Sequence, residues 1–197
     1  MKKISGGALI TKILIQNGIS KAFCVPGESY LGVLEAIRES KNKFDLVVCR
    51  HEGGAAYMAE AYGRLTQMPG ICFVTRGPGA CNASIGVHTA YHEGTPLILF
   101  VGQVPVKSLK KNAFQSIDTD KFFNSMAKYT ETIKDPKNIR KILEKAIYIS
   151  TEGKPGPVVL AIPEDIQFAM VSDKISEVLE NKTYKIKSKT FRAYIKA

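Results

Sequence analysis

The chain has 197 residues, an apolar content of 45% and a formal net charge of +10 at pH 7. This length suits one domain with an extension, and the apolar fraction is sufficient for a buried core. No run approaches the roughly 20 apolar residues of a membrane-spanning helix, so we expect no membrane partner. The basic excess is scattered except in residues 171–197, which hold seven Lys or Arg against three Asp or Glu. Because this segment carries no recognisable binding motif, we interpret it as a basic tail or linker and expect no nucleic-acid partner.

Five helices are predicted, most of them from apolar residues at helical spacing. The first places four apolar side chains on one face, at Leu9, Ile10, Ile13 and Leu14. It lacks the long apolar region and cleavage site of a signal peptide, so we expect a cytoplasmic protein. A second helix, at residues 30–40, is expected to face inward through Leu31, Leu34 and Ile37. Two more are predicted at residues 52–65 and 136–151, and a crossover helix follows the glycine-rich start at residue 77.

Strands are predicted between these helices. They are apolar runs at residues 21–25, 45–49, 70–75, 96–102 and 157–163, with a further candidate at 128–133. Continuous apolar strands separated by helices are typical of a parallel sheet covered on both faces. We therefore predict an α/β fold: a doubly wound, mainly parallel six-stranded sheet with helices on both faces, forming a domain of residues 1–170. Ligands of such sheets bind beyond the carboxyl ends of the strands, at a topological switch point.

The sequence contains neither a metal-binding motif nor a complete dinucleotide-binding motif. Cys24, Cys49, Cys72 and Cys81 form no CxxC pair, and His88 and His92 lack an HExxH context, so we predict free thiols and no metal site. A glycine-rich segment, Gly77-Pro78-Gly79, opens a helix after a strand, as in a dinucleotide fingerprint. The third glycine is missing, however, and the expected acidic residue would fall near Leu99 in an apolar strand. The sequence therefore disfavours NAD binding.

Residues 47–64, VVCRHEGGAAYMAEAYGR, deliver a carboxylate, Glu52, from a strand end to the first turn of a helix. Taken alone, that position is explained by the helix dipole or by capping. The wider pattern is more specific. RHEGGAAYMAEAYGR, followed by PGICFVTRGPGACNASIG and PLILFVGQVP, resembles the pyrimidine-binding domain of thiamine-diphosphate enzymes, in particular the acetolactate synthase-like group. The resemblance covers about residues 5–166.

The resemblance implies a cofactor, thiamine diphosphate, and a catalytic role for Glu52. A carboxyl group hydrogen-bonded to the pyrimidine N1′ favours the imino tautomer, whose exocyclic nitrogen can remove the C2 proton to leave the ylide; the carbanion chemistry belongs to the cofactor. The remaining implied contacts to the cofactor come from Pro26, Gly27, Gly77, Pro78, Gly79 and Asn82. The implied substrate is a small 2-keto acid, and the residues near it are Phe114, Gln115 and Gln103. Arg76 stands where many relatives carry a small residue, so it is either a structural change or a cation that faces an anionic substrate.

Several departures from the family pattern weaken the assignment of pyruvate as substrate. Gly53 replaces a common Gln, residues 92–94 replace an Asp-Ser pair, and Asn112 and Ser116 replace acidic residues. The GDG segment and Asn pair that anchor diphosphate and Mg in this family are not found. We therefore expect this chain alone to be inactive and to form a homo-oligomer, a dimer or tetramer, completed by a diphosphate-binding domain that could also bring FAD. The alternatives kept open are a domain of a longer enzyme, a separate subunit of a two-chain decarboxylase, a non-catalytic assembly or regulatory module, and a generic nucleotide-binding domain.

Overall fold

The computed structural model describes residues 3–40 and 42–173. Its centre is a six-stranded sheet in the order β3-β2-β4-β5-β7-β6, and every neighbouring pair is parallel. The strands are β2 (Lys21–Cys24), β3 (Asp45–Val48), β4 (Gly70–Thr75), β5 (Leu97–Gln103), β6 (Tyr129–Thr132) and β7 (Pro157–Pro163). The predicted α/β fold with a six-stranded parallel sheet is confirmed. The predicted basic tail lies largely outside the described residues, at 174–197.

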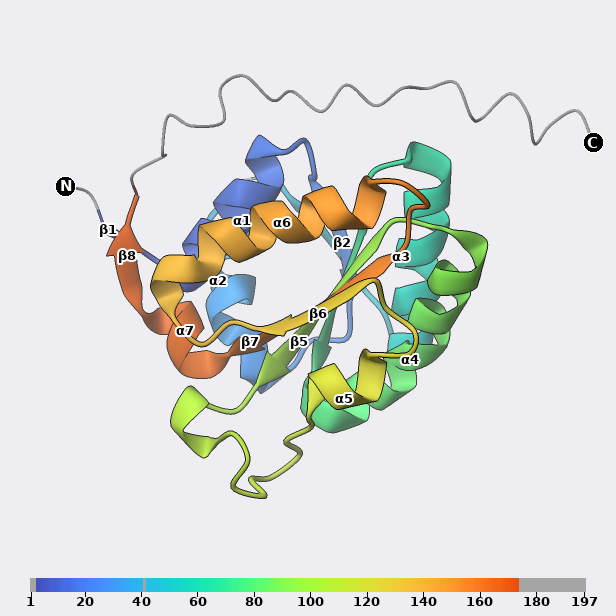
Figure 1. The fold of residues 1–197 in the computed structure, drawn as a ribbon. Coiled ribbons are helices and arrows are strands. Elements are labelled where there is room, and N and C mark those ends of the chain that lie inside the picture. The colour runs from blue at the N-terminus through green and yellow to red at the C-terminus, as the bar shows by residue number, and fades with distance from the viewer. Residues whose placement is uncertain (1–2, 41, 174–197) are drawn as a thin grey trace, which may run out of the picture.

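Helices cover both faces of the sheet (Figure 1). One face carries α1 (Gly6–Gln16), α2 (Leu31–Glu39) and α6 (Ile139–Thr151). The other carries α3 (Glu52–Thr66), α4 (Arg76–Glu93) and α5 (Thr119–Phe123). Shorter elements are η1 (Glu28–Tyr30), η2 (Val106–Ser108), η3 (Pro136–Asn138) and α7 (Glu164–Phe168). Among the described residues, no helix has the length and apolar character needed to cross a bilayer.

The α1 face has a core of large aliphatic side chains. The predicted inner faces of α1 and α6 are buried, including Ile10, Leu14 and Leu143. Capping fixes the start of α1, because the Ser5 side chain accepts a hydrogen bond from the Ala8 N–H at 3.2 Å. The prediction for α2 was wrong in one position. Leu31 is 52% exposed, because this helix turns Val33 and not Leu31 toward the sheet.

A second, two-stranded sheet was not predicted from sequence. β1 (Lys3–Ser5) pairs antiparallel with β8 (Met170–Ser172), and the register aligns Ile4 with Val171. Figure 1 shows this pair at the edge of the α1 side, where the chain beyond α7 meets the N-terminal segment. Lys12 of α1 then pairs with Asp173 at 2.5 Å. The described unit is thus closed by contacts between its two ends.

Candidate functional site

The carboxyl edge of the sheet has a topological switch point between β2 and β4. β3 lies on one side of β2 and β4 lies on the other, so the connections after β2 and β4 leave toward opposite faces. Ligands of doubly wound folds bind in the crevice that this divergence creates. The turn at Pro26 and Gly27 follows β2, and the segment from Arg76 follows β4. The predicted residues at these positions are therefore brought to the same edge.

Glu52 is the first residue of α3 and meets the start of α4. Its Oε2 accepts a hydrogen bond from the Asn82 side-chain amide at 2.9 Å, across 30 residues of sequence. The preceding residue, His51, caps the helix by accepting the Gly53 N–H on Nδ1 at 3.0 Å. Since His51 caps the helix, the Glu52 carboxylate is not needed to accept a backbone N–H of the first turn, as a carboxylate at this position often does. Its carboxylate is half-buried and oriented by one side-chain donor.

The two helices approach closely enough for this contact because they meet through small residues. The buried residues of α3 and α4 are mostly Gly and Ala. A Cβ on Gly86 of α4 would lie 2.5 Å from the Cβ of Ala56 on α3. Any larger side chain there would push the helices apart. A Cβ on Gly79 would lie 3.6 Å from Oε1 of Glu52, so the second carboxylate oxygen also faces glycine backbone.

The turn after β2 is pressed against the end of β4. A Cβ on Gly27 would overlap the Thr75 hydroxyl, so only glycine permits this contact. The Ser29 hydroxyl donates to Thr75 Oγ1 at 3.2 Å. The Tyr30 hydroxyl donates to the carbonyl of Val25, and burial raises the pKa of Tyr30. Pro26 and Gly27 are therefore held at the switch point, with the Pro26 side chain exposed.

The loop that contains Phe114 and Gln115 is tied to the same edge. The Gly77 N–H donates to the carbonyl of Gln115 at 2.8 Å. The Gln103 side chain is buried, and both polar atoms of its amide are hydrogen-bonded. Its Nε2 donates to the Ile117 carbonyl at 2.9 Å, and its Oε1 accepts a hydrogen bond from the Val104 N–H. Gln103 therefore anchors the loop with its side chain, while Phe114 is 74% exposed. The structure brings the backbone of Gln115 to Gly77, but leaves the Phe114 ring facing outward.

Sequence reasoning missed two acidic residues at this edge. Arg76 forms ion pairs with Glu28 at 3.3 Å and with Glu164 at 2.7 Å. Glu28 lies in the turn after β2, and Glu164 comes directly after β7, so both lie beyond strand ends, as the other site residues do. Their positions beyond strand ends were the sequence signal that could have identified both residues. These contacts favour a structural role for Arg76, because both of its terminal nitrogens are paired with carboxylates of the same chain.

The cysteine and histidine residues form no metal centre in the part of the chain that the structure describes. Burial raises the pKa of the Cys24 thiol to about 11 and the pKa of the Cys72 thiol well above its usual value. Both are free thiols, as is exposed Cys81. The rings of His88 and His92 lie on the outside of α4 with their centroids 4.4 Å apart and their planes tilted by 48°.

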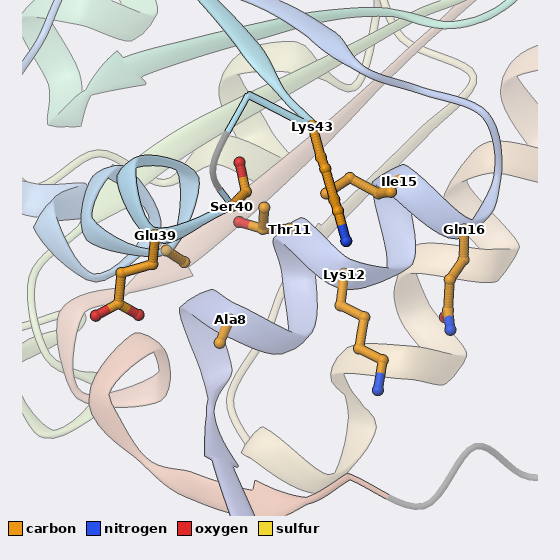
Figure 2. A pocket seen from close by; sticks show the side chains of 9 residues that line it. Ala8, Thr11, Lys12, Ile15, Gln16, Glu39, Ser40 and Lys43 are labelled. Carbon is orange, nitrogen blue, oxygen red and sulfur yellow. The ribbon is translucent and has the colours of Figure 1, made fainter.

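A separate pocket of about 400 Å³ lies between α1 and α2. Figure 2 shows Lys12 and Gln16 extending from α1, with Lys43 reaching in from the turn after α2. This is the sheet face opposite Glu52 and Asn82. The lining residues all come from α1, α2 and that turn, and none of them is a predicted site residue.

Comparison with known proteins identifies the class. The profile of the thiamine pyrophosphate enzymes, N-terminal TPP binding domain, matches residues 4–122. The chain therefore belongs to the thiamine pyrophosphate (thiamine diphosphate) enzymes, as an N-terminal domain of that family. The resemblance found in the sequence is confirmed.

Acetolactate synthases are among the relatives of this chain. The catalytic subunit of the mitochondrial enzyme of Saccharomyces cerevisiae is 34% identical over 172 residues, 87% of this chain and 25% of the relative. The isozyme 3 large subunit of Escherichia coli is 35% identical over 84% of this chain and 29% of its own length. The Bacillus subtilis acetolactate synthase is 35% identical over 83% of this chain and 28% of its own length. The chain thus spans between a quarter and three tenths of these relatives.

The residues at the switch point fit the pyrimidine end of this cofactor. They provide an oriented carboxylate on Glu52, with Oε1 beside Gly79, and a turn at Gly27 without a side chain. A planar ring needs such a combination of backbone walls and one acidic group. The diphosphate end needs other ligands, and the described residues hold no cluster of three or more acidic, His or Cys side chains for a cation.

Proposed function

We propose that this domain forms the pyrimidine-binding half of the active site in a thiamine-diphosphate-dependent, acetolactate synthase-like enzyme that acts on a 2-keto acid. The observation that carries the proposal is the position of Glu52. It lies at the N-terminus of α3 beside the switch point, with one oxygen bonded to Asn82 and the other beside Gly79. Membership of the thiamine pyrophosphate enzymes and the likeness to acetolactate synthases support it.

Glu52 is the proposed catalytic residue. Thiamine diphosphate, when bound, supplies a thiazolium that stabilises a carbanion. In our proposal Glu52 Oε1 holds and shares a proton with the pyrimidine N1′, and the Asn82 amide fixes the carboxylate rotamer through Oε2. A positioned carboxyl group of this kind acts as a general acid and base. Pro26, Gly27 and the segment 77–79 provide the walls that orient the ring and exclude water from it.

The rest of the active site is proposed to lie outside this domain. The chain spans at most three tenths of the relatives named above, and its described part offers no cation cluster. We propose that a diphosphate-binding domain, in the same chain or in a separate subunit, anchors the diphosphate and Mg and could bring FAD. The domain of residues 1–170 is then inactive alone. Phe114 and Gln115 contribute to the substrate side, and Gln103 supports them through its bond to the loop.

We also propose that the domain assembles as a homo-oligomer through α3 and α4. Their outer faces expose the apolar residues Tyr57, Met58, Leu65, Ile85 and Tyr91. These helices also carry Glu52 and Asn82, so a partner on this face would enclose the site. The same face supports the second candidate, a non-catalytic assembly module. The free thiols support the proposed cytoplasmic location.

The test is Glu52→Gln in the complete enzyme, with exchange of the cofactor C2 proton followed by NMR. We expect exchange to slow by at least about 100-fold, because an amide cannot shuttle the proton, with the melting temperature unchanged. Glu35→Gln, which alters an exposed carboxylate of α2, is the matched control and should exchange normally. Unchanged exchange in Glu52→Gln would remove the catalytic assignment, and cofactor binding without turnover in the native enzyme would favour the assembly module.

A further inference from the structure

Three charged side chains cross the carboxyl edge of the sheet next to the candidate site. Arg76 is central, with one terminal nitrogen 2.7 Å from Glu164 Oε1 and the other 3.3 Å from Glu28 Oε1. The Arg76 side chain is only 11% exposed, whereas Glu28 is 68% exposed. This cluster links the connections after three strands: β2, β4 and β7. The pair between Arg76 and Glu28 spans the switch point itself.

The backbone at Arg76 is also unusual. Its φ is +46°, a left-handed conformation that a residue with a Cβ adopts only where its surroundings impose it. The next residue, Gly77, donates its N–H to the Gln115 carbonyl at 2.8 Å. The two ion pairs and this hydrogen bond are among the contacts that hold the segment in place. The side chain therefore acts on the start of α4 as well as on its two carboxylate partners.

The geometry argues against Arg76 as a receptor for the substrate. Both terminal nitrogens already face carboxylates of the same chain, and the side chain is almost buried. One cation against two anions leaves the cluster with a net charge of −1, which would repel a further carboxylate. Arg76 is better described as a brace between fixed elements.

The element that this brace holds is the turn at residues 26–29. Gly27 packs directly on Thr75, and the Ser29 carbonyl accepts a hydrogen bond from the Gln167 side chain at 2.8 Å. The turn is therefore gripped by β4 and α7 through uncharged contacts. Arg76, which lies between Thr75 and Gly77 and reaches α7 through Glu164, adds the ionic contact to Glu28.

We propose that Arg76 is a positioning residue. It holds the turn at residues 26–29 as one wall of the crevice at the switch point, and it keeps the Glu28 carboxylate at the mouth of that crevice. This inference rests on the proposed function, because it assigns the turn to the wall that meets the pyrimidine ring. It adds a role for three residues, Arg76, Glu28 and Glu164. The wall presents negative charge, and so favours ligand groups that donate hydrogen bonds over carboxylates.

The experiment compares Arg76→Ser and Arg76→Lys with the wild type in the complete enzyme. Binding of thiamine diphosphate with Mg²⁺ is measured by calorimetry. We expect Arg76→Ser to weaken binding about tenfold, with partial recovery in Arg76→Lys, which retains the charge. The control is Arg140→Ser on α6, which removes an Arg–Glu pair of similar burial far from the switch point. It should leave the affinity unchanged.

Hydrogen–deuterium exchange of the turn gives a reading that needs no cofactor. Arg76→Ser should speed amide exchange at residues 27–30 by about tenfold relative to the rest of the sheet edge, and Arg140→Ser should not. Equal exchange at the turn in wild type and Arg76→Ser would overturn the positioning role. Wild-type protein that fails to bind the cofactor would instead refute the proposed function, while the exchange data would still decide the role of Arg76.

Discussion

The two faces of the central sheet are covered by different kinds of side chain. Against α1, α2 and α6 the core is made of large residues such as Ile13, Leu14 and Leu143. Against α3 and α4 it is made mainly of alanine and small aliphatic residues, among them Ala56, Ala59 and Ala83. The first layer buries much apolar surface for each residue, and burial is the main favourable term in folding. The second buries less and brings backbones closer together.

The α1 layer therefore contributes mainly to stability, whereas the α3–α4 layer sets the geometry of the site. The α3–α4 layer places Glu52 against Asn82 by letting two helices approach through Gly86 and Ala56. The α1 layer contains none of the predicted site residues. We therefore expect changes on the α1 side to affect unfolding more than function, and changes on the α3–α4 side to affect both the spacing of the helices and the site.

The largest effect on stability is expected for Leu14→Ala. Leu14 is fully buried in the α1 layer, and its truncation leaves a cavity. The free energy of unfolding should fall by about 2–5 kcal/mol, measured by urea denaturation of the chain. Leu31→Ala, at a 52% exposed position on α2, is the control and should change it by less than about 0.5 kcal/mol. Similar losses for both variants would contradict the stabilising role assigned to the buried side chains of the α1 layer.

A smaller loss is expected for Gly86→Ala, which adds a methyl group between α3 and α4. The new Cβ would lie 2.5 Å from the Cβ of Ala56, so the helices must separate, at a cost of about 1–3 kcal/mol. Gly54→Ala is the matched control, because its Cβ would meet nothing within 4 Å and should stabilise α3 by about 0.5–1 kcal/mol. If Gly86→Ala were also stabilising, the close approach would not be required. Denaturant titration of both variants decides this.

The smallest effect on stability is expected for Ile85→Glu. Ile85 is 52% exposed on α4, so the free energy of unfolding should change by less than about 0.5 kcal/mol. The variant should nevertheless weaken self-association by at least about tenfold in sedimentation velocity, because a carboxylate would be buried at the proposed interface. Leu31→Glu, equally exposed on α2, should associate like the wild type. Equal association of all three proteins would show that α4 is not part of the interface.

Local patterns in the sequence determined the alternation of strands and helices and the place of Glu52. Apolar runs and helical periodicity depend on near neighbours, so they could be read without a fold. The convergence of residues 25–27, 51–52 and 76–79 also followed from sequence, because parallel strands share one carboxyl edge. The inward position of Leu31 did not follow, because the rotation of a short helix is set by its packing on the sheet.

Only the tertiary structure decided the contacts between distant segments. The Arg76–Glu164 pair joins residues 88 positions apart, and β1 meets β8 at opposite ends of the described chain. The tertiary structure also decided that the Gln103 amide donates to a loop carbonyl and that the Phe114 ring is exposed. Such partners are chosen by strand order and by the space left between packed helices. Strand order and the space between helices are not encoded in the local spacing of residues. The ion pairs of Arg76 with Glu28 and Glu164 therefore could not be predicted from the sequence.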